Sequence, residues 1–367
     1  MKHFRKALIY LLLAVNIVFI GLLLYSAYSP WIINPTVHPI LSCIGLIFPV
    51  FLFINFGFLI FWLFTYPRLA LIPVLGFLLC IGQIRTYIPV NFRKDKIPAH
   101  SVKVLSYNVM GFNKLKKYTK EDPNPIIEYI LSKNPDIICL QEFQFSTDKS
   151  LLTETDINRA FSDYPYHVKT NLSANGNGNW LACYSKFPIL SSRRIPYESI
   201  YNGSVMYELL MGRDTVTLVN NHLESNKLTK EDKDVYVDMI KDPEARKVKK
   251  GVKHLVRKLA EASAIRAVQA DVVGKEIAAS KHQSIIVCGD FNDTPISYAH
   301  RVIAQNLNDA FTMSGRGIGI SYNQHRFYFR IDNILISKNL EAYNCTVDKS
   351  IKESDHYPIW CYIALKK

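Results

Sequence analysis

The stretch Ile285-Ile-Val-Cys-Gly-Asp-Phe-Asn-Asp293 decides the fold of this chain. Its first four residues are apolar and predict a short buried strand, and Gly289 predicts a tight turn at the strand's end. Asp290 and Asn292 then lie at the carboxyl end of the strand, where open α/β sheets place ligand-binding and catalytic groups. An Asp-Asn pair after a strand is also ordinary turn chemistry. The weight of the stretch therefore depends on what the rest of the chain adds.

Two earlier segments repeat the pattern of a strand that ends in a polar side chain. Val102–Asn108 alternates apolar and polar residues up to Asn108, and residues 136–142 form an apolar run that ends at Glu142. Between them, residues 125–133 carry apolar side chains at the spacing of one helix face. Strand, helix and strand in succession predict a layered α/β domain. The oxygen-bearing tips suit Mg²⁺, which takes one or two carboxylates together with water and substrate phosphate.

Three residues in later segments could take part in proton transfer. His222 follows another buried strand, Asp332 lies in the predicted strand 330–337, and His356 belongs to the terminal Ser-Asp-His-Tyr-Pro segment. A histidine can accept or donate a proton near pH 7, and a buried carboxylate fixes its tautomer and raises its basicity. Asp332 is a candidate for that carboxylate beside His356. Each histidine taken alone could equally be structural.

Residues 1–97 predict a membrane anchor. Uncharged runs at 7–28 and 40–64 are each long enough to cross a bilayer, and a weaker run at 69–88 gives a third span. A basic segment followed by an apolar run is also typical of a cleaved signal peptide. The first run is long for a signal core, and uncharged sequence continues to Tyr66. We therefore expect about three transmembrane helices, followed by a separate catalytic domain over 98–367.

The distribution of basic residues bears on the side of the membrane. The basic amino terminus favours a cytoplasmic start, so three crossings would place the catalytic domain outside the cytoplasm. Arg93, Lys94 and Lys96 follow the third span and argue the other way. We expect an integral protein of a bacterial inner or plasma membrane with an extracytoplasmic catalytic domain.

Composition narrows the possible partners only a little. The net charge of +13 fits an anionic substrate or a membrane surface without choosing between them. A dense cluster of Lys and Arg within residues 247–258 is either a solvated helix face or a contact for lipid headgroups or nucleic acid. The seven cysteines are an odd number and show no CxxC spacing. They predict buried free thiols rather than a disulfide framework or a zinc site.

Six fragments in order, SYNV, LQE, NHLE, GDFND, RIDNILIS and SDHYP, resemble the endonuclease/exonuclease/phosphatase superfamily of metal-dependent phosphoesterases. The resemblance covers about residues 100–367. It implies a four-layer α/β sandwich, in which two mixed sheets face each other, helices cover the outer faces, and the site lies at one edge. Facing sheets would also explain why so many of the predicted strands are apolar on both faces.

The resemblance implies a role for each polar tip. Asn108 and Glu142 would hold Mg²⁺ or Mn²⁺, with Asp355 at or near the metal. Asp290 would align or deprotonate the attacking water, and Asn292 would donate a hydrogen bond to a phosphoryl oxygen.

The histidines have less settled roles in the family. His356, paired with Asp332, would act as general base or as phosphate binder, and His222 would stabilise the transition state or protonate the leaving group. A metal ion and prearranged donors would supply most of the catalysis, because attack on phosphorus builds charge on the equatorial and leaving oxygens.

The substrate is harder to infer than the reaction. The spans that lead straight into the domain favour a phosphoesterase tethered to the lipid bilayer and acting on a phosphodiester or phosphomonoester such as a phospholipid headgroup. The alternative is a membrane-anchored nuclease that degrades extracytoplasmic DNA or RNA. A third interpretation is a non-enzymatic binding protein on the same scaffold. The inositol-polyphosphate phosphatases of the family carry a PxWCDR segment and the pattern GDxNxR. This chain lacks the first and has GDFND in place of the second, which argues against that branch. Nothing in the sequence implies a protein partner.

Overall fold

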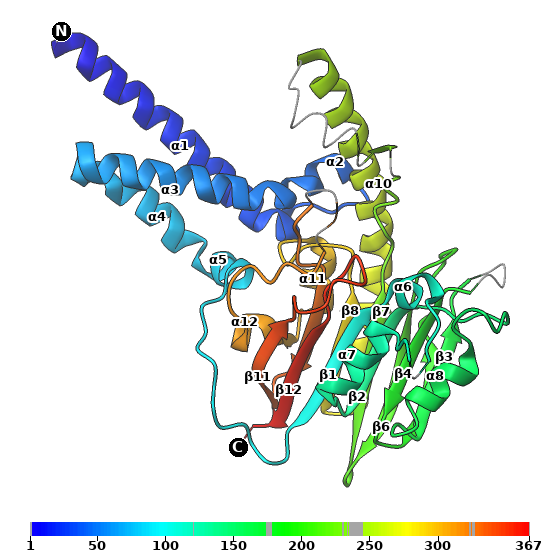
Figure 1. The fold of residues 1–367 in the computed structure, drawn as a ribbon. Helices are drawn as coiled ribbons and strands as arrows, with labels where there is room; N and C mark the ends of the chain where they lie inside the picture. The colour runs from blue at the N-terminus through cyan, green and yellow to red at the C-terminus, as the bar shows by residue number, and fades with distance from the viewer. Residues whose placement is uncertain are drawn as a thin grey trace.

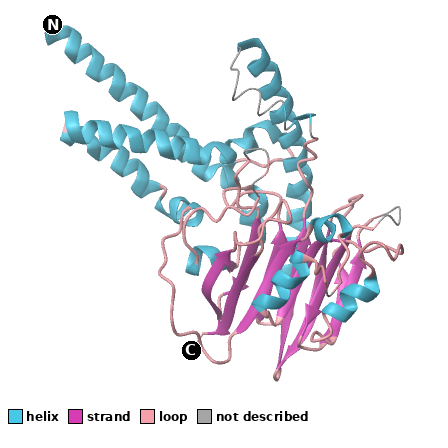
Figure 2. Ribbon diagram, in the orientation of Figure 1, coloured by secondary structure: helices cyan, strands magenta, loops and turns pink. Residues whose placement is uncertain are grey.

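The computed structural model describes residues 2–119, 121–173, 178–229, 231–232, 234, 245–322, 324 and 327–366. An N-terminal group of apolar helices leads into a body of two facing β-sheets (Figure 1). Helices lie on the outer faces of these sheets (Figure 2).

Each sheet has six strands. The first contains, in spatial order, β11 (Leu340–Val347), β12 (Ile359–Leu365), β1 (Val102–Asn108), β2 (Ile137–Phe143), β4 (Trp180–Ser185) and β3 (Tyr166–Asn171). The second contains β5 (Ile189–Arg194), β6 (Gly203–Met211), β7 (Asp214–His222), β8 (Ser284–Asp290), β10 (Asp332–Ser337) and β9 (Leu307–Asp309). The pairs β1–β2 and β7–β8 are parallel, whereas their outer neighbours run antiparallel. Both sheets are therefore mixed.

Strand β2 shows why the strands are apolar on both faces. Ile137 and Cys139 belong to the core between the two sheets. Ile138 and Leu140 point the other way, into the core beneath the outer helices, because successive side chains of a strand alternate between its faces. Burying a large apolar side chain contributes about 1.5–3 kcal/mol, so every position of such a strand stabilises the sandwich.

Helices complete the outer layers. The first sheet is covered by α7 (Pro125–Lys133) and α8 (Glu154–Ala160), and the second by α10 (Ala245–Ala278) and α11 (Tyr298–Ile303). The short helices α6 (Met110–Leu115) and α12 (Ala310–Ser314) lie in connections. The Asn124 side chain begins α7 by accepting hydrogen bonds from the backbone N–H groups of Ile126 and Ile127. The predicted four-layer α/β sandwich is confirmed.

Two further predictions concern cysteines and basic residues. All seven cysteines are buried and free, as predicted. The basic cluster begins α10, but the side chains of Lys247, Lys249 and Lys250 lie outside the described part of the structure. Farther along the helix, Arg257 is exposed, and Lys258 forms an ion pair with Asp232.

The N-terminal bundle, residues 2–87, consists of consecutive helices. They are α1 (Lys2–Ile32), α2 (Pro39–Ser42), η1 (Cys43–Ile47), α3 (Phe48–Thr65), η2 (Pro67–Ala70), α4 (Leu71–Leu79) and α5 (Ile81–Tyr87). His3–Ile32 and Pro39–Thr65 are each long and apolar enough to cross a membrane. The third predicted span, 69–88, is not one straight helix, since the chain bends by 68° between α4 and α5. Where three spans were expected, the structure thus has two helices that are long and apolar enough to cross a membrane and one bent helix pair, which is either a broken span or a re-entrant loop.

Polar side chains join α1 to α3 inside this bundle. Asn16 donates through Nδ2 to Oδ1 of buried Asn55 (3.2 Å) and accepts from Nε1 of Trp62 (3.0 Å). Asn55 donates in turn to the Phe51 carbonyl oxygen (2.8 Å). In hydrocarbon such groups hold helices together, because no water is present to satisfy them.

The N-terminal bundle and the chain that leaves it are docked against the catalytic body. Ser42 Oγ lies 3.1 Å from Ser263 Oγ on α10. Arg330 donates to the Thr86 carbonyl oxygen at the end of α5 (2.6 Å). Just beyond, the backbone N–H of Lys94 donates to Asn344 Oδ1 (2.8 Å), and Asn344 Nδ2 returns a bond of the same length to the Lys94 carbonyl. The bundle is therefore packed onto the body at several points.

Gly45 sits at the closest approach between the bundle and the body. A Cβ atom there would lie 2.3 Å from the carbonyl oxygen of Ile296, and backbone cannot give way as a flexible side chain can. We predict that Gly45→Ala lowers the free energy of unfolding by about 1–3 kcal/mol, the usual cost of overpacking. Thermal unfolding of the full chain in lipid nanodiscs measures this. Gly57→Ala is the matched control, because a Cβ at Gly57 meets nothing within 4 Å; equal midpoints for the two variants would contradict the tight joint.

Candidate active site

Three polar residues form a row across the second sheet. His222 ends β7, Asp290 ends β8 and Asp332 begins β10, and the strand register pairs Asp290 with both of the others. Residues directly opposite on neighbouring strands point to the same face, with Cα atoms about 5 Å apart. Gly289 lets the strands meet here: its φ is +127°, and a Cβ would lie 2.0 Å from the Asn221 carbonyl oxygen. Strand register alone thus brings three of the eight predicted site residues together.

The first sheet supplies Asn108 and Glu142. Asn108 is the last residue of β1, and Glu142 lies where the pairing of β2 with β4 shifts register between Leu140 and Phe143. A bulge of this kind re-aims a side chain, and Glu142 has a φ of +49°. Asn292 has a φ of +51°. Positive φ outside glycine costs roughly 1–3 kcal/mol and clusters at functional sites.

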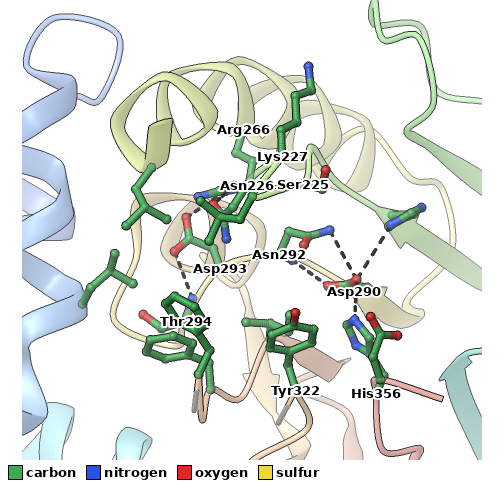
Figure 3. A pocket seen from close by; sticks show the side chains of 18 of the residues that line it. Ser225, Asn226, Lys227, Arg266, Asp290, Asn292, Asp293, Thr294, Tyr322 and His356 are labelled. Atoms are coloured by element: carbon green, nitrogen blue, oxygen red, sulfur yellow. Dashed lines mark hydrogen bonds and ion pairs between the residues drawn. The ribbon is translucent and has the colours of Figure 1, made fainter. Parts of the chain in front are cut away.

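Asp290 is the centre of the resulting cluster. Its Oδ2 accepts from Nδ2 of Asn108 (3.2 Å), and its Oδ1 accepts from the backbone N–H of Asn292 (2.8 Å). The Nε2 atoms of His356 and His222 lie 3.6 and 3.8 Å from Oδ2. Figure 3 shows Asn292 and His356 next to Asp290, with dashed lines that mark their interactions with its carboxylate. Both histidines therefore lie within reach of one carboxylate.

His356 is fixed by its second ring nitrogen. Nδ1 lies 2.8 Å from Asp332 Oδ2, and the ring of Tyr322 packs edge-on against the imidazole at 5.2 Å. Ser354 ties this loop to β1, because its Oγ donates to the Asn108 carbonyl oxygen (2.7 Å). Burial opposes protonation of His356, but the carboxylates of Asp332 and Asp290 outweigh it and raise its pKa well above the usual value.

Burial shifts the pKa values of Asp290, Glu142 and His222 in the direction that favours their neutral forms. It raises the pKa of Asp290 to about 6, with Asp332 adding to the shift and the two histidines opposing it. It also raises the pKa of Glu142, to which Asp355 adds. His222 is shifted the other way, since burial lowers its pKa. The site thus concentrates acidic groups where their charge is costly.

This charge balance fits a bound divalent cation. The described basic side chains that line the pocket are Lys227 and Arg266, and each already pairs with an acid, Glu224 and Asp293 respectively. A cation at Glu142 would offset the desolvation that chiefly raises the pKa of this carboxyl, and the repulsion from Asp355 that adds to it. Carboxylate and amide oxygens are also the ligands that Mg²⁺ prefers.

Two sets of side chains could hold the cation. Asp290, Asp332 and His356 bring ligand atoms within 4.8 Å of one another. In that set, however, His356 and Asp332 already satisfy each other with a 2.8 Å bond, and a hard cation prefers oxygen to imidazole. We therefore favour the carboxylate of Glu142 as the principal ligand, with Asp355 beside it on the pocket wall.

Asn108 and Asn292 are oriented differently from the expectation. The amide nitrogen of Asn108 faces the acids, donating to Glu142 Oε1 (3.1 Å) and Asp290, whereas its oxygen accepts from the N–H of Met110. Asn292 Nδ2 donates to the Leu223 carbonyl (2.9 Å) and to Asp290 (3.3 Å). As arranged here, both amides support Asp290. Metal ligation by the Asn108 oxygen needs the opposite amide orientation and stays a prediction, as does a bond from Asn292 to phosphate.

Six of the eight predicted residues line one pocket of about 250 Å³: Glu142, His222, Asp290, Asn292, Asp355 and His356. Asn108 and Asp332 lie behind this wall, where they contact Asp290 and His356 respectively. The wall also contains residues that sequence reasoning missed: Leu46, Ser225, Asn226, Lys227, Leu228, Leu259, Arg266, Asp293, Thr294, Tyr322, Phe327, Phe329 and Ile331. In Figure 3, Asp290 and His356 stand on one side of the pocket, and Asp293 and Thr294 lie toward the N-terminal bundle. Ser225–Lys227 directly follow His222–Glu224, so their place in the chain could have indicated them. Leu46 lies in an apolar run and carried no such signal.

Two family models match the sequence. One, described as the endonuclease/exonuclease/phosphatase family, matches residues 105–356. The other, described only as a domain of unknown function, matches residues 8–87. No curated protein matches the chain.

Solved structures with a similar fold share little sequence. The human Nocturnin catalytic domain with bound sulfate has a TM-score of 0.51 at 18% identity, covering 76% of this chain and 97% of that one. A humanized D. rerio TDP2 has a TM-score of 0.49 at 15% identity, and the match covers 72% of this chain and 100% of that one. An endonuclease/exonuclease/phosphatase protein from Beutenbergia cavernae has a TM-score of 0.48 at 13% identity, and the match covers 72% of each chain. At these identities the likeness extends to the fold alone.

We predict that Mg²⁺ stabilises the native protein through Glu142. At a Mg²⁺ concentration a hundred times its Kd, the free energy of unfolding should rise by about 2.7 kcal/mol. Glu142→Ala should lose this gain. Without metal, and at a pH above the raised pKa of Glu142, the variant should be at least as stable as the native chain. The reason is that the substitution removes an ionised carboxylate whose desolvation costs free energy.

Thermal unfolding with and without MgCl₂ measures both effects. Glu261→Ala is the control, since its side chain is 61% exposed on α10. A full Mg²⁺ shift in Glu142→Ala would contradict the assignment of this ligand.

Proposed function

This chain belongs to the endonuclease/exonuclease/phosphatase family, and from that premise we propose that it is a divalent-metal-dependent phosphoesterase, held at a membrane, that hydrolyses the phosphate ester of a lipid headgroup. The family consists in general of phosphate-ester hydrolases. The proposal adds the metal dependence, the membrane location and the lipid substrate.

One observation carries the lipid part of the proposal. Leu46 of the N-terminal bundle lies in the wall of the same pocket that contains Asp290 and His356. The bundle has two helices long and apolar enough to cross a membrane. A pocket bordered by such helices is well placed for a phosphate ester that lies in the bilayer surface.

Asp290 is suited to orient the attacking water. Its carboxylate is held by the backbone N–H of Asn292 and by the side chain of Asn108, so its free electron pairs have a fixed direction. A pKa of about 6 leaves it ionised at neutral pH and more basic than an ordinary aspartate. General bases work best when their pKa is near the working pH.

The two histidines are suited to different tasks. His356, whose raised pKa keeps it protonated at neutral pH, can donate from Nε2 to a phosphoryl oxygen. His222 is neutral because burial lowers its pKa, and its Nδ1 has no described hydrogen-bond partner. It can stabilise charge on the leaving oxygen by hydrogen bonding. Of the two roles open to His356, the structure favours phosphate binding over general base catalysis.

A divalent cation held by Glu142 and Asp355 would supply charge neutralisation for the phosphate and lower the pKa of water. The remaining requirement, exclusion of bulk water, is served by Tyr322 and Phe329, which line the pocket.

The arrangement of the bundle favours a catalytic body on the side opposite the amino terminus. In Figure 1 the amino terminus lies at the far end of α1, away from the sheets, and α5 returns to the body. With a cytoplasmic start, the body lies outside the cytoplasm. Protease added to intact cells or spheroplasts should then cleave the body while leaving a cytoplasmic amino-terminal tag intact. Protection of the body until the membrane is opened would reverse this orientation.

The substrate class can be tested with the purified full chain in nanodiscs. We expect Mg²⁺- or Mn²⁺-dependent release of phosphate-containing product from phosphatidylinositol or sphingomyelin, abolished by EDTA. His356→Ala should reduce the rate by at least about a hundredfold, within the usual contribution of a proton-transferring or charge-stabilising group.

Plasmid DNA and an abasic duplex provide the competing substrates. Cleavage of DNA without any action on lipids would support the nuclease alternative and refute the lipid proposal. A nuclease would also lose affinity steeply with salt, because bound phosphates release counterions. No hydrolysis of any ester with either metal would favour the non-enzymatic interpretation.

A further inference from the structure

The active-site pocket adjoins a second, smaller cavity of about 20 Å³. Four residues line both: Leu46, Leu259, Arg266 and Asp293. The second cavity is further lined by Ser29, Pro30 and Ile33, at the end of α1. The side of the pocket formed by Leu46 and Leu259 thus faces the membrane helices.

Arg266 and Asp293, the polar residues that line both cavities, are already paired with each other. The Arg266 guanidinium donates to Asp293 Oδ2 (3.1 Å), to the Glu224 carbonyl and to Asn226 Oδ1 (both 2.9 Å). What Leu46 and Leu259 present to a ligand is therefore apolar surface. Phe327 and Phe329 add aromatic surface to the same pocket.

Aromatic residues mark where the membrane boundary meets this side. Tyr28 and Trp31, 40% and 58% exposed, lie at the body end of α1, and exposed Tyr and Trp collect at membrane–water interfaces. At the other end of the bundle the Arg5 guanidinium lies over the Tyr66 ring, 5.9 Å from its centroid. Residues 5 and 31 of one helix are separated by roughly 39 Å at 1.5 Å per residue. That is close to a bilayer with its headgroup layers, about 40–45 Å.

Leu46 falls near the inner edge of the headgroup layer on this scale. It lies seven residues into the candidate span Pro39–Thr65, which places it roughly 10 Å from the end of the span. A bilayer of about 40–45 Å around a hydrocarbon core of about 30 Å has headgroup layers of some 5–7 Å each. If the span begins at the outer edge of the headgroup layer, Leu46 would lie at the depth of the glycerol and first methylenes of a lipid.

The size of the pocket agrees with a partly enclosed ligand. At about 250 Å³ it is smaller than the pockets of roughly 300–1,000 Å³ that enclose a whole drug-sized ligand. A phosphorylated headgroup fits, whereas two acyl chains do not. The chains of a lipid bound there would have to stay in the bilayer.

We propose that Leu46 and Leu259 form a subsite for the proximal hydrocarbon of an amphiphilic phosphate ester, so that the N-terminal bundle is part of the substrate-binding site. This inference rests on the proposed function. The ester enters sideways from the leaflet, its first methylenes contact Leu46 and Leu259, and its phosphate reaches Asp290 and His356. Selectivity for membrane-embedded esters over soluble ones then arises in part from a residue of the bundle.

The test compares two esters in one preparation of the full chain in nanodiscs. A long-chain phosphodiester in the bilayer and the water-soluble bis(p-nitrophenyl) phosphate are assayed with Mg²⁺. Leu46→Ala should raise the KM for the long-chain ester. The kcat/KM for the long-chain ester, divided by that for the soluble ester, should therefore fall about tenfold. The matched control is Ile47→Ala: Ile47 is the next residue, 44% exposed, and does not line the pocket, so this variant should keep the native ratio. An unchanged ratio in Leu46→Ala would overturn the subsite while leaving the phosphoesterase proposal standing.

A binding measurement separates the subsite from turnover. A long-chain alkyl phosphonate with a diazirine near its head should label Leu46 or Leu259, and excess unlabelled phosphonate should suppress this labelling. Phe53, 76% exposed on α3, reports contact with bulk lipid and should be labelled without such competition. If excess unlabelled phosphonate does not suppress labelling of Leu46, the subsite is refuted, whether or not any ester is hydrolysed. If the unlabelled phosphonate suppresses labelling but no ester is hydrolysed, only the proposed reaction is refuted.

Discussion

The register of β7, β8 and β10 is the constraint on which the site depends. It sets His222, Asp290 and Asp332 opposite one another at the ends of three neighbouring strands. A slip of one residue in either pairing would turn a whole set of side chains to the other face of the sheet. Such a slip is opposed by the core, because Ile286 and Cys288 of β8 are buried between the sheets and Val287 is buried beneath α10 and α11. The same burial that stabilises the sandwich therefore fixes the geometry of its polar edge.

The scaffold also carries an electrostatic cost. Buried Asp290 and partly buried Glu142, whose side chain is 34% exposed, lie close to other acids. Desolvation and these acids raise the pKa of each carboxyl, and Glu142 and Asn292 have unfavourable backbone conformations. Buried polar contacts between the sheets hold the edge together, among them the bond from Gln141 Nε2 to Asn220 Oδ1 (2.6 Å). This combination of local strain and firm support is typical of a site prepared for a charged ligand.

Much of the fold could be predicted from the sequence because its strands follow local rules. The predicted segments 102–108 and 125–133 coincide with β1 and α7, and the polar strand tips do come together around Asp290. Local patterns could not show which amide group faces Glu142, since that depends on neighbours from other strands. They also could not place Leu46, which looks like any other apolar residue of a membrane segment. Its position follows from the close packing of Gly45 against Ile296, a long-range contact without a sequence signature.

The bend between α4 and α5 shows the same limit. The apolar run at 69–88 predicts one span, yet the chain turns by 68°, and the Thr86 carbonyl at the end of α5 accepts a bond from Arg330. Hydropathy registers only that the segment is apolar. The direction of the helix is decided by its contact with the catalytic body.

The bundle is docked at Ser263 and Arg330, and the chain that leaves it is held by Asn344. These contacts leave little freedom for the body to swing on its attachment. If the chain acts on lipid as proposed, an enzyme fixed in this way to its own leaflet would meet its substrate by two-dimensional diffusion. Its effective substrate concentration is then a surface density, set by the mole fraction of the ester in that leaflet rather than by the amount of lipid in the suspension. Diluting the membrane with inert lipid would slow it, while diluting the vesicles in buffer would not.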